Sequence, residues 1–404
     1  MEEQTTANRY KGYSRADNRN IWVDYLRSFL TVLVVAHHST LAYTTFASFD
    51  AEAYIRSTHP MVDAHRWIGL DIFQNFNDIF FMSLMFLVGG LFLSRSIARK
   101  GTVTFILDRM YRLFIPFLFL GTFFMLIAHF PSYYVAHGHT GITAYVLDFF
   151  TVEQWPVGPP WFICVLFVFN VIFALISPVL QSYNRQIAKG VDILGKHPVW
   201  AVFLLLVVTW VLYVPVAYTA GPGTWTGWGP FDFQVSRVAL YFGYFMTGVC
   251  IGYTRFNEGL FSAKSVLVKY WWLWGLFAVG IYTVLTILSG SLGAMFRQGT
   301  ISEFQAWMIY YTLYVGSCVL SCVACITLFR RFAKHEVSWW RSLSDNAYLI
   351  YLIHYIFVIW IQFLLRDAGI PALVKFFITF GGALGLSWVA AVGMRKIKPV
   401  RHYL

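Results

Sequence analysis

The chain has 404 residues, of which 58% are hydrophobic, 20% aromatic and only 12% charged. A soluble protein of this size cannot bury so much apolar surface, so we expect the lipid bilayer to solvate much of it. The formal net charge of +11 raises the question of nucleic acid. The basic residues are not clustered into one stripe, however, and we expect no nucleic-acid partner.

Ten stretches are long enough to cross a hydrocarbon core of about 30 Å as helices. They lie near 22–46, 70–94, 103–129, 160–181, 198–218, 235–253, 270–289, 305–328, 346–365 and 372–394. The sequence therefore predicts an all-α fold, a polytopic membrane bundle of about ten transmembrane helices. Residues 22–394 would form this domain, between an amino-terminal tail, 1–21, and a basic carboxy-terminal tail, 395–404.

The distribution of Lys and Arg predicts the orientation of these spans. With the amino terminus inside, most of the 30 basic residues fall in cytoplasmic segments. Outer segments hold only Arg56, Arg66, Arg237, Arg297 and Arg366. Because cytoplasmic loops of membrane proteins are enriched in Lys and Arg, we expect both termini in the cytoplasm.

The five cysteines all fall in apolar stretches: Cys164, Cys250, Cys318, Cys322 and Cys325. Free cysteine is commonly buried as a small hydrophobic residue, so neither disulfides nor metal ligation is indicated. We expect no metal site.

Arg27 and His38 share one face of the first expected helix. Eleven residues make three helical turns plus about 20°, with a rise of roughly 16 Å, so both side chains point the same way at different depths. A cation and an imidazole inside an apolar helix are functional candidates by default. The alternative is that Arg27 extends to the membrane surface and that His38 is a hydrogen-bonded core residue. With the amino terminus inside, Arg27 would lie near the cytoplasm and His38 at or beyond the midplane.

Arg109 and Arg112 enter the third helix from the cytoplasmic side, three residues apart. Side chains at this spacing are neighbours on a helix, and guanidinium groups bind phosphate oxygens through two parallel hydrogen bonds. Together with Arg27 they predict a pocket for an anionic, phosphate-bearing molecule. The alternative is ordinary positive charge flanking a membrane helix.

The second helix opens with a polar cluster on the outer side that includes Asp71 and Asp78. Either carboxylate, at the expected depth of His38, could accept a hydrogen bond from the imidazole and fix its tautomer. We take Asp78 as a catalytic candidate. The alternative is that the cluster solvates a helix end.

Candidate substrate-binding residues are Trp161, at the start of the fourth span, and Tyr351 and His354 on the ninth. Tyr351 and His354 are three residues apart and so share a face. Aromatic residues of the outer loops would form either an interfacial belt or a stacking platform for sugar rings.

These elements together resemble the integral-membrane acyltransferase family 3. The matching residues are Asp24-Tyr25-Leu26-Arg27 with His38 after ten further residues, Gly89-Gly90 with Phe92, Arg109-x-x-Arg112 before Pro116, Trp161-Phe162, and Tyr351-Leu352-Ile353-His354. They follow the family's order over residues 24–354. The compact chain is further similar to bacterial periplasmic-glucan succinyltransferases. One departure is Val88, which stands where the family usually has serine or threonine.

The resemblance implies an acyltransferase that transfers groups other than aminoacyl groups. An acetyl or succinyl group would pass from cytoplasmic acyl-coenzyme A, a co-substrate, to a hydroxyl of an extracytoplasmic carbohydrate or glycolipid. Arg27 and His38 would be essential, and Arg109 and Arg112 would engage the donor. The natural location is a bacterial plasma membrane.

Two other functions fit the same composition. A multi-pass transporter would use Arg27 and His38 to line a substrate or proton path, although related halves with broken helices are not evident. A non-catalytic partner in a cell-envelope assembly would tolerate loss of His38 and of both arginines of the third helix.

Overall fold

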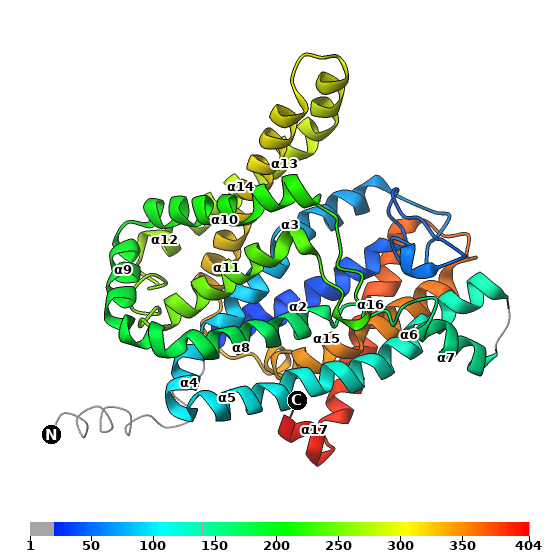
Figure 1. The fold of residues 1–404 in the computed structure, drawn as a ribbon, viewed down its shortest axis with the longest axis horizontal. Helices are drawn as coiled ribbons and strands as arrows, with labels where there is room; N and C mark the ends of the chain where they lie inside the picture. The colour runs from blue at the N-terminus through cyan, green and yellow to red at the C-terminus, as the bar shows by residue number, and fades with distance from the viewer. Residues whose placement is uncertain (1–19, 139–140, 404) are drawn as a thin grey trace.

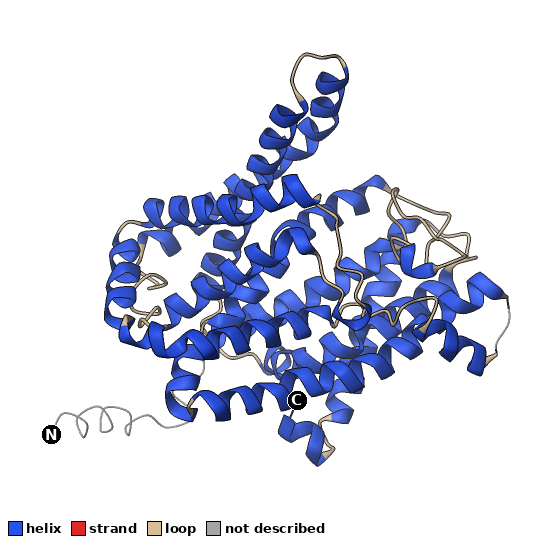
Figure 2. Cartoon of the chain, in the orientation of Figure 1, coloured by secondary structure: helices blue, strands red, loops and turns tan. Residues whose placement is uncertain are grey.

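The computed structural model describes residues 20–138 and 141–403. The expected amino-terminal tail, 1–21, lies outside this part of the chain except for its last two residues. The described residues are mainly helical, as Figures 1 and 2 show, and no strand is formed among them beyond an isolated bridge between Trp225 and Gln234.

The long helices, labelled as in Figure 1, are α2 (Ile21–Leu41), α3 (Ile68–Gly90), α6 (Thr122–His137), α8 (Trp161–Ser182), α10 (Pro198–Ala220), α11 (Val235–Gly252), α13 (Trp271–Arg297), α14 (Glu303–Phe332), α15 (Ser338–Leu365) and α16 (Ala372–Met394). Shorter segments are η1 (Tyr54–Arg56), α4 (Leu93–Lys100), α5 (Thr102–Arg109), η2 (Met110–Phe114), η3 (Pro116–Gly121), α7 (Ile142–Phe150), α9 (Asn184–Lys196), η4 (Gly229–Phe231), α12 (Val266–Lys269) and α17 (Lys398–Tyr403).

Nine helical runs of the described residues are long and apolar enough to cross a membrane. The fold is thus the all-α polytopic membrane bundle that the sequence predicts. The first expected span is also formed, as α2, but it is not among the nine. Asp24, Arg27, His37 and His38 lower its mean hydropathy.

Helix α2 lies within the bundle, where neighbouring helices cover much of its surface. It packs against α3, α14, α15 and α16. The stripe of Leu26 and Leu30 is fully buried. Since protein rather than lipid surrounds much of this helix, it retains polar side chains that a lipid-facing helix would exclude.

Helices α2 and α15 run parallel and contact each other along their whole lengths. The rings of Tyr25 and Trp340 stack with centroids 4.5 Å apart, and Ser28 Oγ and Ser344 Oγ are 3.0 Å apart. Further along, Gln362 Nε2 donates to the carbonyl oxygen of His38 at 3.2 Å. These contacts define two ends of the bundle, which we call the Arg27 end and the Arg366 end.

Close packing of α3 on α11 depends on glycine. A Cβ at Gly90 would lie 2.2 Å from the carbonyl oxygen of Phe245, and one at Gly248 would lie 2.0 Å from that of Leu87. Small residues permit two helix backbones to approach closely in membranes. In the Gly89-Gly90 pair, it is Gly90 that permits this approach.

The helix that carries Arg109 and Arg112 contains two π-helical segments in succession, η2 and η3. Pro116 begins the second segment, and proline has no backbone N–H to donate within a helix. The wider π turns are rare and are frequently found at functional sites. The chain then continues as α6 to His137, beyond the expected end of the third span.

The other large differences from the expected spans are helices that extend beyond their apolar segments. Helix α15 begins at Ser338, before its apolar run, and α13 continues to Arg297. Figure 1 shows α13 and α14 as a hairpin that projects from the rest of the bundle. A hydropathy pattern locates the apolar part of a helix, whereas hydrogen bonding continues into polar residues.

Candidate functional site

His38 and His354 form the centre of the candidate site. Their Nδ1 and Nε2 atoms, respectively, are 3.3 Å apart. His38 Nδ1 also lies 2.9 Å from the carbonyl oxygen of Val34, and His354 Nδ1 lies 2.7 Å from that of Tyr351. A carbonyl oxygen only accepts, so each Nδ1 carries a hydrogen and donates. The hydrogen of His38 Nδ1 is then shared between the Val34 carbonyl oxygen and His354 Nε2, and His38 Nε2 is left as an unprotonated nitrogen.

The two imidazoles differ in exposure. His354 is fully buried, whereas His38 retains partial exposure. The base nitrogen of His38 is therefore on the more accessible ring, and His354 orients it from the buried side. The neighbouring His37 is buried, its Nδ1 has no hydrogen-bond partner among the residues that the structure describes, and its ring centroid lies 5.1 Å from that of Phe81.

Arg27 lies near the start of α2, whereas His38 lies near its end. The Arg27 side chain pairs with Asp24. The Arg27 Nη2 to Asp24 Oδ1 distance is 3.4 Å, and 54% of the Arg27 side chain is exposed. An exposed guanidinium at a helix end is available to a solvent-borne anion. Its ion pair with Asp24 contributes little stability at such exposure.

Arg109 and Arg112 adopt different environments on the same helix. Arg112 Nε lies 3.1 Å from Asp108 Oδ1, and Asp108 also binds Lys100 at 2.9 Å. The Arg109 guanidinium lies 5.0 Å from the centroid of the Phe105 ring, and its buried Nε has no partner among the described residues. This end of the helix therefore presents the unpartnered Nε of Arg109 beside two further cations and one carboxylate.

One turn of α15 connects the two arginine-bearing segments. Ser344 Oγ contacts α2 at Ser28, and Tyr348 Oη donates to the carbonyl oxygen of Arg112 at 3.0 Å. Ser344 and Tyr348 are four residues apart on α15 and so share a face of the helix. Arg27 and Arg112 thus belong to segments that flank the same turn, at the same end of the bundle.

Asp78 does not contact His38, which corrects the sequence-based expectation. Asp78 Oδ2 accepts instead from Arg237 Nη2 at 2.5 Å. Asp71, the other candidate, accepts from Thr45 through both its backbone nitrogen (2.8 Å) and its hydroxyl. Periodicity within one helix could not show which neighbour each carboxylate faces.

Arg237, one of the five basic residues expected on the outer side, pairs with Asp78 from the first turn of α11. It lies within α11 and is 93% buried, with 7% of its surface exposed. Its guanidinium lies 5.6 Å from the Tyr314 ring centroid, and Nη1 donates to the carbonyl oxygen of Asp78 at 3.2 Å. A buried cation requires such a partner.

Tyr351 lies beside the histidine pair, while Trp161 lies further away. The Tyr351 ring centroid is 5.9 Å from that of His354, and its hydroxyl donates to the carbonyl oxygen of Pro159. Trp161 packs in an aromatic cluster with Tyr241 and Trp225 at 5.9 and 6.1 Å. Trp161 therefore packs on aromatic residues near the site, and it does not contact the two imidazoles.

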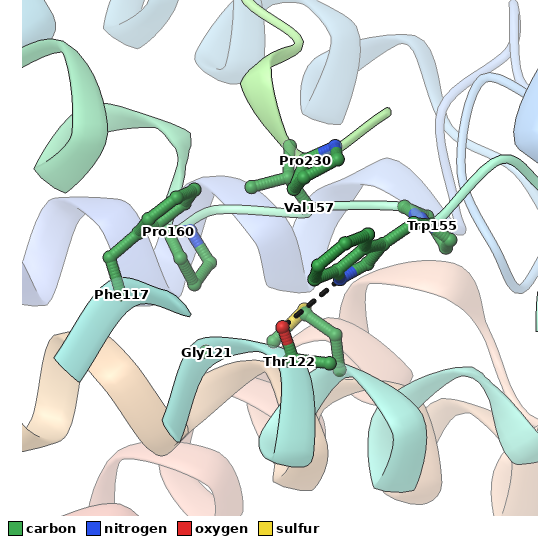
Figure 3. A pocket seen from close by; sticks show the side chains of 9 residues that line it. Phe117, Gly121, Thr122, Trp155, Val157, Pro160 and Pro230 are labelled. Atoms are coloured by element: carbon green, nitrogen blue, oxygen red, sulfur yellow. Dashed lines mark hydrogen bonds between the residues drawn. The ribbon is translucent and has the colours of Figure 1, made fainter. Parts of the chain in front are cut away.

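A small cavity of about 10 Å³, room for about one water molecule, lies between η3 and the segment that precedes α8. Figure 3 shows Trp155 above it, with Nε1 donating to Thr122 Oγ1 at 3.0 Å. Gln154 and Trp155 have φ values of 53° and 59°. Bulky residues rarely adopt this left-handed conformation, which is held here by surrounding contacts.

Sequence reasoning missed four polar residues on the Arg366 side of His38: His59, His129, Tyr355 and Gln362. The Tyr355 ring centroid lies 5.3 Å from that of His38, 5.9 Å from that of His59 and 6.0 Å from that of His129. A lone amide in an apolar span, such as Gln362, is a detectable signal. His59 lies in an irregular loop and offers none.

Within the described ranges, no group of three or more His, Cys, Asp or Glu side chains is arranged to hold a metal ion.

Comparison with known proteins gives one match. A sequence model of the family described as "Acyltransferase domain" matches residues 20–392. Neither the curated proteins nor the solved structures yield a match. The family match spans α2 through nearly all of α16 and so includes both histidines and all three arginines of the site. The chain belongs to the acyltransferase family 3 and is an integral, multi-pass membrane acyltransferase.

Proposed function

We propose that this protein moves an acetyl or succinyl group from acyl-coenzyme A to a hydroxyl of an extracytoplasmic carbohydrate, glycolipid or glucan. The observation that carries this proposal is the His38–His354 pair, whose hydrogen bonds leave His38 Nε2 as a base. The family membership supports acyl transfer in general. A bacterial plasma membrane, with the Arg27 end in the cytoplasm, is the location that suits this reaction.

The donor would bind at the Arg27 end through its phosphates. Arg109, Arg112 and Arg27 supply guanidinium groups there, and the unpartnered Nε of Arg109 is a ready donor. Phosphate oxygens would compete with Asp108 for Arg112, because a phosphate carries more charge than one carboxylate. The pantetheine arm would then extend along α2 toward His38.

In the transfer step, His38 Nε2 removes the proton from the acceptor hydroxyl as its oxygen attacks the thioester carbonyl carbon. The carbon–sulfur bond breaks, and the proton on Nε2 passes to the leaving thiolate. The products are an O-acyl ester and free coenzyme A, so no net proton is consumed. General-base assistance of this kind contributes ~10²–10⁴-fold to the rate.

Asp78 has no direct part in this step. Its carboxylate is occupied by Arg237, and the hydrogen bond from His38 that would fix the tautomer goes to His354 instead. Tyr351, through the carbonyl oxygen that accepts from His354 Nδ1, is a positioning residue.

The test is acyl transfer by purified protein in lipid nanodiscs, with radiolabelled acyl-coenzyme A and envelope glycans. Replacing His38 with Ala should abolish transfer while leaving acyl-coenzyme A binding and elution behaviour unchanged. The exposed His335 gives a matched control, His335→Ala, expected to be active. Near-normal turnover by His38→Ala, or no binding of acyl-coenzyme A by the wild type, would refute the proposal.

A further inference from the structure

An open recess of about 410 Å³ lies at the Arg366 end of the bundle. This volume is within the range of small-molecule sites, about 300–1,000 Å³. Its lining combines apolar surface from Phe49, Met61 and Val135 with the guanidinium-bearing Arg66 and Arg366. The donor residues lie at the opposite end of α2 and α15, so this recess is not part of the donor site.

Two walls of the recess continue inward to a hydrogen-bonded pair. Pro60 follows His59 in the loop, and Arg366 lies one helical turn beyond Gln362 on α15. His59 Nε2 lies 2.8 Å from Gln362 Oε1, an amide oxygen that accepts, so the imidazole donates. Both side chains are buried. They separate the recess from the carbonyl oxygen of His38, which Gln362 Nε2 also contacts.

The third wall continues inward to polar groups that have no partner. Val135 lies one turn beyond Ser132 and two turns beyond His129 on α6. Both ring nitrogens of His129 and the Oγ of Ser132 are buried without a hydrogen bond to any described residue. Buried polar groups are nearly always paired, because an unpaired one destabilises the fold. These groups therefore indicate a ligand or water that completes them.

The ring of Tyr355 connects these groups to the catalytic imidazole. His38 and His129 both contact this ring, with centroids 5.3 and 6.0 Å from it, and Tyr54 stacks with His129 at 6.1 Å. A ligand that hydrogen-bonds to His129 would thus be separated from His38 only by the ring of Tyr355.

Resting on the proposed function, we propose that the recess and the unpartnered groups beneath it form the acceptor site, with His129 a binding residue for a carbohydrate hydroxyl. The carbohydrate would extend from Arg366 toward His38, passing where the His59–Gln362 hydrogen bond now lies. Arg366 is twelve residues beyond His354 on α15, a rise of about 18 Å. An acceptor of several sugar units would span this distance better than a single sugar.

The charge balance favours a neutral polyhydroxyl acceptor over an anion. Asp63, in the lining, is held 2.6 Å from the fully buried Lys375, so the two charges cancel. Asp367 adds a carboxylate to the lining next to Arg366, and Arg66 already donates through Nε and Nη1 to the carbonyl oxygens of Asp63 and Thr45 at 3.1 and 3.3 Å. Burial lowers the pKa of His59 to about 4, so its imidazole is neutral near pH 7. Neutral imidazole, hydroxyl and amide groups donate to and accept from sugar hydroxyls.

The experiment measures transfer from acyl-coenzyme A to glucose oligomers of increasing length, both free in solution and attached to lipid in vesicles. His129→Gln and Arg366→Gln should each raise the KM for the acceptor by roughly 3- to 30-fold, the range expected for one or two lost hydrogen bonds. The KM for acyl-coenzyme A, and its slow hydrolysis without acceptor, should not change. Longer oligomers should lose more from Arg366→Gln than short ones.

Matched controls are His335→Gln and Arg297→Gln, both exposed positions away from the recess. Unchanged acceptor KM values in both test variants, with normal wild-type transfer, would overturn the acceptor site and leave the proposed function intact. Equal loss of acyl-coenzyme A affinity would also overturn it. If His129→Gln does not fold, the acceptor KM values of Ser132→Ala and Arg366→Gln test the acceptor site in its place. No transfer by the wild type to any free or lipid-linked oligomer would instead refute the proposed function.

Discussion

His38 and His354 are separated by 316 positions in the sequence, yet their ring nitrogens lie 3.3 Å apart. Each ring is oriented by a carbonyl oxygen of its own helix, from Val34 and Tyr351. The contact therefore depends on the register of α2 against α15. A shift of one residue along either helix would turn one ring away by about 100°.

Replacing His354 with Gln should lower kcat roughly 10- to 100-fold with little change in the KM for acyl-coenzyme A, because the variant misorients the base without removing it. The pH dependence of kcat should also shift, since His354 no longer accepts from His38. Steady-state kinetics across pH measure both effects. A fall in stability with an unchanged pH profile would show that His354 is only structural.

The Asp78–Arg237 ion pair predicts a stability effect. Replacing Asp78 with Asn leaves the Arg237 guanidinium buried without its counter-charge, which typically costs about 3–5 kcal/mol. The melting temperature in detergent should fall clearly. Asp367→Asn, at an exposed carboxylate, should leave it nearly unchanged. An unaltered melting temperature in Asp78→Asn would show that the pair contributes little.

Among the elements, α3 and α11 are the most closely packed through glycine. Gly90→Ala places a Cβ against the backbone of Phe245 and Val249, at 2.2 and 2.8 Å, so the helices must separate. Gly89→Ala meets only the flexible end of Leu166 at 3.2 Å. We expect a lower melting temperature and lower yield for Gly90→Ala than for Gly89→Ala. Equal stability of the two variants would contradict this packing.

The segment before α8 predicts a pH effect through Glu153. Its carboxylate is buried and accepts from the backbone nitrogens of Tyr54 (3.0 Å) and Ile55 (2.5 Å). Burial, with help from Asp148 and Asp50, raises the pKa of this carboxyl from 4.5 to about 7. The folded state thus retains a proton that the unfolded chain has already released.

The sign of the effect follows from this difference. Stability should fall as pH rises from about 4.5 to about 8, by roughly 3 kcal/mol at most, because the folded state binds more protons over that range. Glu153→Gln mimics the protonated carboxyl and should remove this component. Melting temperatures of wild type and variant across pH provide the comparison. Parallel curves would show that Glu153 does not titrate there.

The elements were largely predictable because each transmembrane helix is a local apolar run, and the observed helices follow those runs. The site was predictable only in part. Arg27, His38, Arg109 and Arg112 lie on helix faces that periodicity identifies. The pairing of Asp78 with Arg237 instead of His38 depends on how α3 meets α11, and periodicity within one helix carries no such information. The loop residues around Tyr355 have no periodic pattern.

For the whole molecule, the distribution of basic residues predicts that the Arg27 end faces the cytoplasm. A cysteine at Lys189, exposed on α9, should then react with a membrane-impermeant maleimide only after cells are opened. A cysteine at Glu52, in the loop beyond α2, should react in intact cells. The reverse pattern would place the donor residues outside and contradict the proposed reaction.

The parallel register of α2 and α15 also fixes a length. Contacts at Tyr25, Ser28, His38 and Gln362 prevent the two helices from sliding, so Arg27 and His38 remain roughly 16 Å apart along the axis. This fixed separation then selects thioester donors by the length of the arm between phosphate and acyl group. A donor with a shortened arm could not contact the guanidinium groups and His38 at the same time. Such a donor should therefore react slowly, however reactive its acyl group.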